Sequence, residues 1–130
     1  MGEPPALDRL ERALRASWDD RTAHLGGRAD NRAAGQCYPT SRVVQWFYPE
    51  AEIVTGQVDT GVSLEDHFWN LLAEDRIDLS WSQFPEGSTI VTARVLDRTQ
   101  LADSPPTVAR CALLLERVQA SLARDLADQA

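Results

Sequence analysis

Three residues of the types that cooperate in nucleophilic catalysis lie in the middle of the chain: Cys37, His67 and Asp78. A cysteine thiolate attacks a carbonyl carbon, a histidine takes up and returns the proton, and a carboxylate holds the imidazole in one tautomer. These roles require the side chains to converge in space although they are far apart in the sequence. The elements that carry them therefore decide whether such chemistry is available.

Cys37 precedes a predicted helix. Pro39 suits the first turn of a helix, because its missing N–H removes a donor that has no partner there. Cys37 then lies at or just before the N-cap, where unpaired backbone N–H groups and the helix dipole favour thiolate over thiol. This predicts a lowered pKa for Cys37, and Gln36 with the Cys37 N–H is a candidate oxyanion hole. The alternative interpretation is a small buried apolar residue at a helix start.

His67 and Asp78 are expected on the two strands of a hairpin, joined by the polar turn around 73–75. Side chains alternate between the faces of a strand, so this odd separation places both residues on one face when the loop holds an even number of residues. Asp78 can then orient the imidazole. Asn70 is a second candidate for orienting His67, but it has the opposite strand parity, and Asp78 is preferred. Alternatively, Asp78 caps a turn and His67 is half-buried beside Trp69.

The apolar spacing around these residues predicts an α+β fold, with the Cys-bearing helix packed on a small antiparallel sheet. The predicted elements are an amphipathic N-terminal helix from Leu7 to about Trp18, an irregular connection over 19–35, a short helix over 41–48, strands over 52–58, 66–72, 76–81 and 89–96, and a long C-terminal helix over about 105–127. No internal repeat is visible, and residues 1–130 are predicted to form a single domain.

The remaining residues that could react or bind a ligand or metal have simpler interpretations. Trp46, Trp69 and Trp81 are interpreted as core residues, with an aromatic cleft as the alternative. Cys111 falls on the apolar stripe of the C-terminal helix, which predicts a buried, inert thiol. His24 lies in the irregular connection, and no His or Cys pair has the close spacing of zinc ligands. We therefore predict no metal and no cofactor.

Composition narrows the classes of partner and the compartment. The chain has 130 residues, a formal net charge of -7 and a pI near 4.7. A polyanion would be repelled, which argues against nucleic-acid binding. Neither a signal-peptide pattern nor a membrane-spanning apolar run is present, so we expect no membrane association and a cytoplasmic location. Two cysteines 74 positions apart are expected to be free thiols there.

Several short segments together resemble the YunG-like family of small bacterial proteins, over most of the chain from about Trp18 onward. The segments are Gly35-Gln36-Cys37, Thr40, Val43-Val44-Gln45, His67-x-Trp69-Asn70, Asp78-Leu79-Ser80 and Gln83-Phe84. That resemblance implies no known reaction. More distantly, the order of a helix-borne Cys, a His-x-Trp strand and an Asp strand is similar to transglutaminase-like and papain-like folds. This second resemblance implies that Cys37 is the nucleophile, His67 the base and Asp78 the orienting residue, although the chain is shorter than those enzymes.

These observations lead to hypotheses of different classes. The first is a cysteine-dependent hydrolase or transferase acting on an amide or ester of a small-molecule or peptide substrate. The second is a binding or accessory module that keeps a papain-like scaffold without turnover, in which Cys37 is structural. A redox-sensing thiol is a third possibility that no feature of the sequence favours. Substrate, partner and oligomeric state are not predicted.

Overall fold

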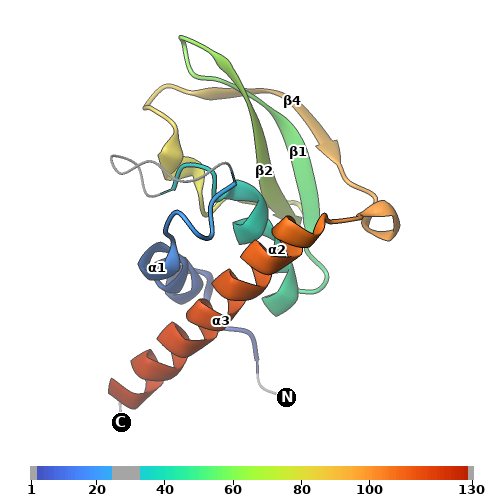
Figure 1. The fold of residues 1–130 in the computed structure, drawn as a ribbon. Helices are drawn as coiled ribbons and strands as arrows, with labels where there is room; N and C mark the ends of the chain where they lie inside the picture. The colour runs from blue at the N-terminus through green and yellow to red at the C-terminus, as the bar shows by residue number, and fades with distance from the viewer. Residues whose placement is uncertain (1–2, 25–32, 129–130) are drawn as a thin grey trace.

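The computed structural model describes residues 3–24 and 33–128 and has the α+β architecture expected from the sequence (Figure 1). The helices are α1 (Leu7–Ser17), α2 (Cys37–Phe47) and α3 (Pro105–Asp128), and the strands are β1 (Glu52–Asp59), β2 (Leu64–Leu72), β3 (Asp75–Ile77) and β4 (Thr89–Val95). Two short 3₁₀ helices, η1 (Trp81–Gln83) and η2 (Arg98–Gln100), flank β4. Within the described part of the chain, no helix is long and apolar enough to cross a membrane.

The four strands form one antiparallel sheet in the order β3-β2-β1-β4. β3 pairs only with Asn70–Leu72, which leaves the first part of β2 without a neighbour on that side. The β2–β3 turn contains two residues, and its first, Ala73, has a φ of 55°. Positive φ at a two-residue hairpin turn matches the right-handed twist of the strands.

Two element boundaries differ clearly from the sequence prediction. The strand expected over 76–81 ends at Ile77, and the chain then turns into η1. Trp81 therefore lies on a 3₁₀ helix and not on a strand. The helix expected over 41–48 begins four residues earlier, at Cys37. Cys37 is thus the first helical residue, and Gln36 occupies the N-cap position.

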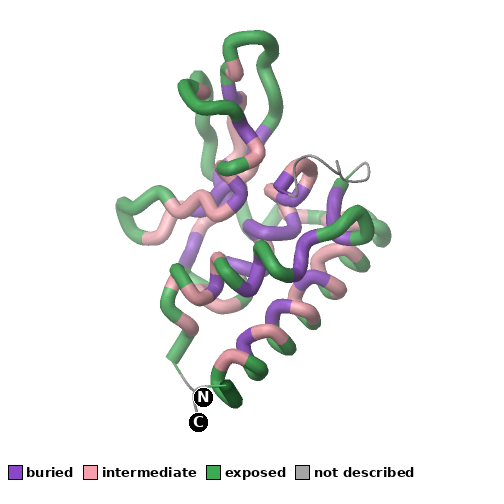
Figure 2. The backbone as a smooth tube through the Cα atoms, turned by 90° about the vertical axis from the view of Figure 1, so that its left-hand side faces the viewer, coloured by how far each residue is buried: buried purple, intermediate pink, exposed green. Residues whose placement is uncertain are grey.

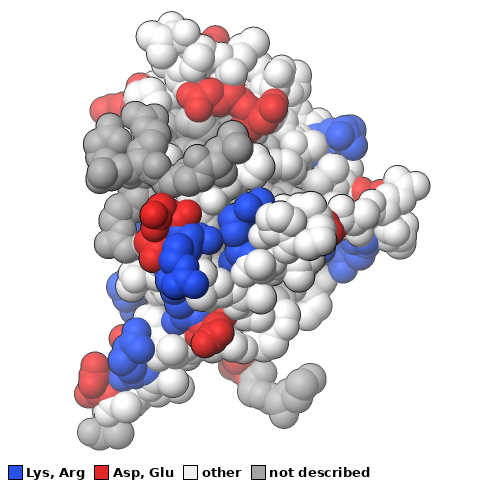
Figure 3. All heavy atoms as spheres, viewed as in Figure 1, with Lys and Arg blue, Asp and Glu red and all other residues white. Residues whose placement is uncertain are grey.

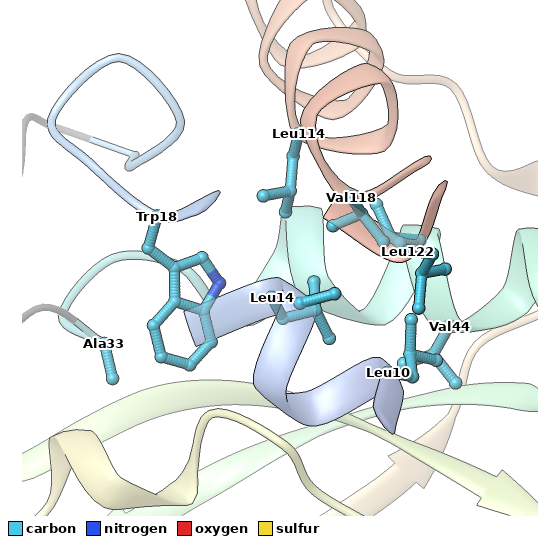
Figure 4. Packing of buried hydrophobic residues seen from close by; sticks show 10 residues of the cluster. Leu10, Leu14, Trp18, Ala33, Val44, Leu114, Val118 and Leu122 are labelled. Atoms are coloured by element: carbon cyan, nitrogen blue, oxygen red, sulfur yellow. The ribbon is translucent and has the colours of Figure 1, made fainter. Parts of the chain in front are cut away.

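The three helices pack together around an apolar core beside the sheet (Figure 4). Leu10 and Leu14 of α1 and Leu114 of α3 are fully buried, so the one-sided apolar spacing of both helices is used as expected. Buried positions recur along α3 once per turn, whereas the tip of the β1–β2 hairpin is exposed (Figure 2). Val62 at this tip has 93% of its surface exposed, so the core lies with the helices and the base of the sheet.

Two of the simpler residue predictions are wrong. Trp46 on α2 is 55% exposed and is no core residue, because its face of α2 borders a groove of about 380 Å³ against α3. Cys111 also lines this groove and is partly exposed, where a fully buried thiol was expected. Burial nevertheless raises the pKa of Cys111 to about 11, which keeps the thiol neutral at physiological pH.

Candidate functional site

The N-terminal end of α2 is held in place by buried hydrogen bonds from two other segments and by one bond within the helix. The indole Nε1 of Trp18 donates to Thr40 Oγ1 at 3.0 Å, and Asn70 Nδ2 of β2 donates to the Ser41 carbonyl at 3.1 Å. Within the helix, Ser41 Oγ donates to the Cys37 carbonyl at 2.8 Å. These bonds fix the position of Cys37 relative to β2.

His67 and Asp78 form a direct hydrogen bond. His67 Nε2 lies 2.7 Å from Asp78 Oδ2, the imidazole is 0% exposed, and the carboxylate is almost as buried. The β2–β3 register pairs Asn70 with Ile77, so Asp78 continues opposite Trp69 on the face that also carries His67. The parity prediction for the hairpin is therefore confirmed, although Asp78 lies just past the end of β3.

Aromatic rings surround the imidazole on its face of the sheet. Trp69 stacks on it at 5.6 Å between centroids and 28° between planes, and Phe84 meets it edge-on at 4.7 Å. Trp81 lies at 5.9 Å, with the Arg76 guanidinium 4.5 Å over its ring. The imidazole is therefore enclosed by aromatic rings, and its carboxylate, which also accepts from Arg76 Nη2 at 3.2 Å, is 5% exposed, so their hydrogen bond is electrostatically stronger than in water.

A glycine on β1 makes room for this arrangement. A Cβ on Gly56 would lie 1.9 Å from the Thr92 carbonyl oxygen and 2.8 Å from the six-membered ring of Trp69. Any side chain at position 56 must therefore displace both β4 and the indole that stacks on His67. The absence of a Cβ serves close approach of a neighbouring strand and ring.

The second nitrogen of His67 faces Gln83. Gln83 Nε2 lies 3.5 Å from His67 Nδ1 and 3.2 Å from the Ser80 carbonyl oxygen, to which it donates. With the carboxylate of Asp78 on Nε2, the hydrogen-bond network assigns the imidazole proton to Nε2 and leaves Nδ1 as an acceptor. Nδ1 is thus the nitrogen available for chemistry.

Cys37 lies at a cavity of about 560 Å³ that is also lined by Gln83 and Phe68. The backbone N–H groups of Phe68 and Tyr38 point at the sulfur. Since Phe68 directly follows His67, this contact places the thiol beside the segment of β2 that carries the imidazole. The Tyr38 ring packs edge-on against Phe68 at 4.8 Å, so α2 covers the face of β2 opposite His67, while the sulfur, which the Phe68 N–H contacts, lies at the edge of β2 that β3 leaves open. Gln83 reaches both sides, since it lines the Cys37 cavity and contacts the imidazole.

The predicted lowering of the Cys37 pKa is wrong. The pKa of the thiol is raised to about 11; burial is the largest cause, the charge of Asp78 contributes to the rise, and the N–H groups of Phe68 and Tyr38 oppose it only in part. The helix start favours the thiolate, as the sequence indicated, but desolvation of the charged form outweighs it. The resting thiol is therefore neutral at physiological pH.

Gln36 and Asn70 do not lie where the sequence placed them. Gln36 Nε2 donates to the Asp19 carbonyl at 2.9 Å and its Oε1 accepts from Thr22 Oγ1 at 2.9 Å, so the side chain ties α2 to the segment after α1. Asn70 donates to the carbonyls of Ser41 and Glu52, on the face of β2 away from the imidazole. Opposite parity separates Asn70 from His67, and the orienting role falls to Asp78.

Other parts of the cavity wall come from the start of α2, the start of β2, and the segment that leads into α3 with the first turns of that helix. The Tyr38 hydroxyl donates to Asp103, which also accepts two bonds from the Arg42 guanidinium at 2.7 and 2.9 Å. Arg110 Nη2 contacts Thr107 Oγ1 at 2.9 Å and His24 Nδ1 at 3.3 Å. On the face seen in Figure 3, acidic side chains gather above and arginines lie below them along α3. Among the described residues, no three His, Cys, Asp or Glu side chains are grouped to hold a metal.

Sequence reasoning missed Gln83, Tyr38 and Asp103 as members of this site. Gln83 is brought to the imidazole by the turn after Ile77, and the polar cluster joins segments 61 and 65 positions apart. Neither the local residue pattern nor the spacing along the chain predicts contacts between segments so far apart. The Gln83-Phe84 pair was visible only as part of the family resemblance.

A family model described as "YunG protein" matches residues 6–123. The chain belongs to the YunG family. The match spans α1, the cysteine-bearing helix, the whole sheet and most of α3. It therefore includes four residues of the site, Cys37, His67, Asp78 and Gln83. No curated protein and no solved structure is similar enough to count as a match. The distant likeness to papain-like folds rests on the order of the Cys, His and Asp residues alone.

Proposed function

We propose that this YunG-family chain is a cysteine-dependent acyl-group hydrolase or transferase in which Cys37 is the nucleophile, His67 the base and Asp78 the residue that orients it. The observation that supports this most is the buried His67–Asp78 pair, bonded at 2.7 Å, whose other nitrogen faces the wall of the Cys37 cavity. Burying a carboxylate and an imidazole away from water costs free energy, which their mutual hydrogen bond offsets only in part. Such a pair beside a thiol is therefore better explained by proton transfer.

The raised pKa of Cys37 sets the form of the reaction. A neutral thiol must lose its proton as it attacks, so the thiol proton passes to His67 Nδ1 while the sulfur bonds to the carbonyl carbon. The carbonyl π electrons move to the oxygen. Collapse of this intermediate expels the leaving group, which takes the proton from Nδ1, and a thioester on Cys37 remains. Water or an acceptor nucleophile then releases the acyl group.

Acylation by an activated ester tests this proposal. Incubation with p-nitrophenyl acetate should place an acetyl group on Cys37, detected by mass spectrometry of the intact chain and of its peptides. Cys37→Ala should abolish the adduct, and Cys111→Ala, which removes the other thiol, should leave it unchanged. Equal slow labelling of both cysteines in the wild type would contradict the proposal.

A second function is favoured by one specific observation, the raised pKa of the thiol. A scaffold that keeps Cys37 neutral and His67 fully buried suits a binding module without turnover, with the cavity as the binding surface for a peptide or small molecule. In that case Cys37→Ala should retain every cellular function of the wild type. Loss of function in a folded Cys37→Ala protein would instead favour the enzyme.

A further inference from the structure

Among the described residues, Gln83 both contacts the imidazole and lines the Cys37 cavity. Its backbone is fixed by η1, in which Gln83 N donates to the Ser80 carbonyl at 3.1 Å and Phe84 N to the Trp81 carbonyl at 3.0 Å. The side chain is only partly buried, and its amide lies against His67 Nδ1 on one side and the cavity on the other. The position of the amide is therefore set by the fold, while its hydrogen-bond partners are exchangeable.

Two contacts of Gln83 Nε2, to Ser80 and to His67, differ in strength. The bond to the Ser80 carbonyl is 3.2 Å long, whereas the contact to His67 Nδ1 is 3.5 Å, at the outer limit for a hydrogen bond. The Nδ1 contact nevertheless occupies the lone pair that must receive the Cys37 proton. A better acceptor entering the cavity would draw this N–H away at little cost.

We propose that Gln83 couples substrate binding to activation of Cys37. In the resting protein its N–H donates to His67 Nδ1, and the thiol stays protonated. When a substrate carbonyl enters the cavity, the same N–H turns to the carbonyl oxygen, which frees Nδ1 to take the thiol proton as the sulfur attacks. The oxygen that gains the π electrons then accepts from Gln83, in the position of an oxyanion donor. This role rests on the proposed acyl-transfer function.

Another glutamine was the expected oxyanion donor, and its contacts favour Gln83 for this role. The Gln36 amide is 1% exposed and is bonded to Asp19 and Thr22, away from the imidazole. Gln83, in contrast, shares the cavity with the sulfur.

The substitution Gln83→Met tests the proposal, because methionine keeps the length of the side chain and removes the N–H donor. Two rates are measured at neutral pH: alkylation of the resting thiol by iodoacetamide and acetylation of Cys37 by p-nitrophenyl acetate. We expect alkylation to become several-fold faster, since Nδ1 is released, and acetylation to become about 10²-fold slower, as for loss of one oxyanion donor. The exposed Gln119→Met on α3 should change neither rate.

Opposite changes in the two rates distinguish this role from a structural one, because a merely loosened site would move both in the same direction. Unchanged acetylation in Gln83→Met, or a parallel fall of both rates with normal thermal unfolding, would overturn the role of Gln83 while leaving the acyl-transfer function in place. Absence of any Cys37 acetylation in the wild type would overturn both. Nitrogen chemical shifts of His67 in Gln83→Met show independently whether the Nδ1 contact existed.

Discussion

The helical core and the site around Cys37, His67 and Asp78 both lie largely in the protein interior. The core is made of apolar side chains, whereas the site contains polar ones. The core between α1, α2 and α3 consists of apolar side chains such as Leu10, Leu14 and Leu114, which are fully buried and need no partners. The site places a buried imidazole and a buried carboxylate among aromatic rings, next to a partly buried thiol. Burying apolar surface stabilises the fold directly, whereas buried polar groups must be compensated by hydrogen bonds. The helices therefore contribute most of the stability, whereas the residues able to take part in a reaction lie on and beside the sheet.

The site is also less completely compensated than the core. Within the described chain, Asp78 Oδ1 is buried and has no hydrogen-bond partner, and Nδ1 of His67 has only the long contact with Gln83. An unsatisfied buried polar atom costs about 1–3 kcal/mol. Proteins tolerate such a cost mainly at functional sites, which supports the interpretation that this region is functional.

The largest expected effect is on the helical core. Leu14→Ala removes a fully buried side chain from the contact between α1 and α3, and should lower the free energy of unfolding by about 3–5 kcal/mol. Urea denaturation followed by circular dichroism measures this. The acetylation rate per folded molecule should stay at the wild-type value. A change in that rate at constant folded fraction would show that the two regions are not separate.

A single methyl group at Gly56 should disturb the sheet and the site together. Gly56→Ala forces Thr92 and Trp69 apart, and we expect a loss of about 3 kcal/mol, near the upper end for overpacking. Tryptophan fluorescence should change as the indole leaves His67. Ala93→Gly on the partner strand, which inserts no Cβ, is the matched control. A Gly56→Ala protein as stable as wild type would contradict the close packing described here.

The raised pKa of Cys37 predicts a pH dependence of stability and reactivity. The folded-state pKa of about 11 lies above the pKa of an unfolded thiol, near 8.5. The neutral thiol therefore contributes fully to the free energy of unfolding below about pH 8.5, and this contribution is lost as the pH rises to 11. The size is on the order of 1–3 kcal/mol. Iodoacetamide labelling of Cys37 should keep rising up to about pH 11. A plateau at pH 7 would mean a lowered pKa and an activated resting thiolate.

The smallest expected effect is at an exposed ion pair remote from both regions. Arg12 and Asp8 pair at 3.4 Å on the outer face of α1, with both side chains largely in solvent. Arg12→Ala should change the free energy of unfolding by about 0.5 kcal/mol or less. Thermal unfolding at low and high salt measures it. A loss above 1 kcal/mol would mean that the charged surface of α1 does more than solvate the helix.

The sequence predicted the helical region better than the site, for physical reasons. Apolar spacing in α1 and α3 reports directly on burial, and strand parity correctly joined His67 to Asp78. The end of β3 was missed because the contact of Trp81 with His67, which is distant in the chain, favours the turn into η1. Likewise, Pro39 correctly indicated that Cys37 lies close to a helix start. The pKa of its thiol could not be predicted, because the desolvation that raises it comes from elements that pack over the cysteine.

The most direct test is the single-turnover rate at which p-nitrophenyl acetate acetylates Cys37, compared between wild type and Asp78→Asn. This change keeps the shape of the side chain that contacts His67 and removes its charge. If the buried pair serves the thiol, the rate should fall by about 10²- to 10⁴-fold in a protein that remains folded. Equal rates in a folded Asp78→Asn protein would contradict the claim that His67 and Asp78 act on Cys37.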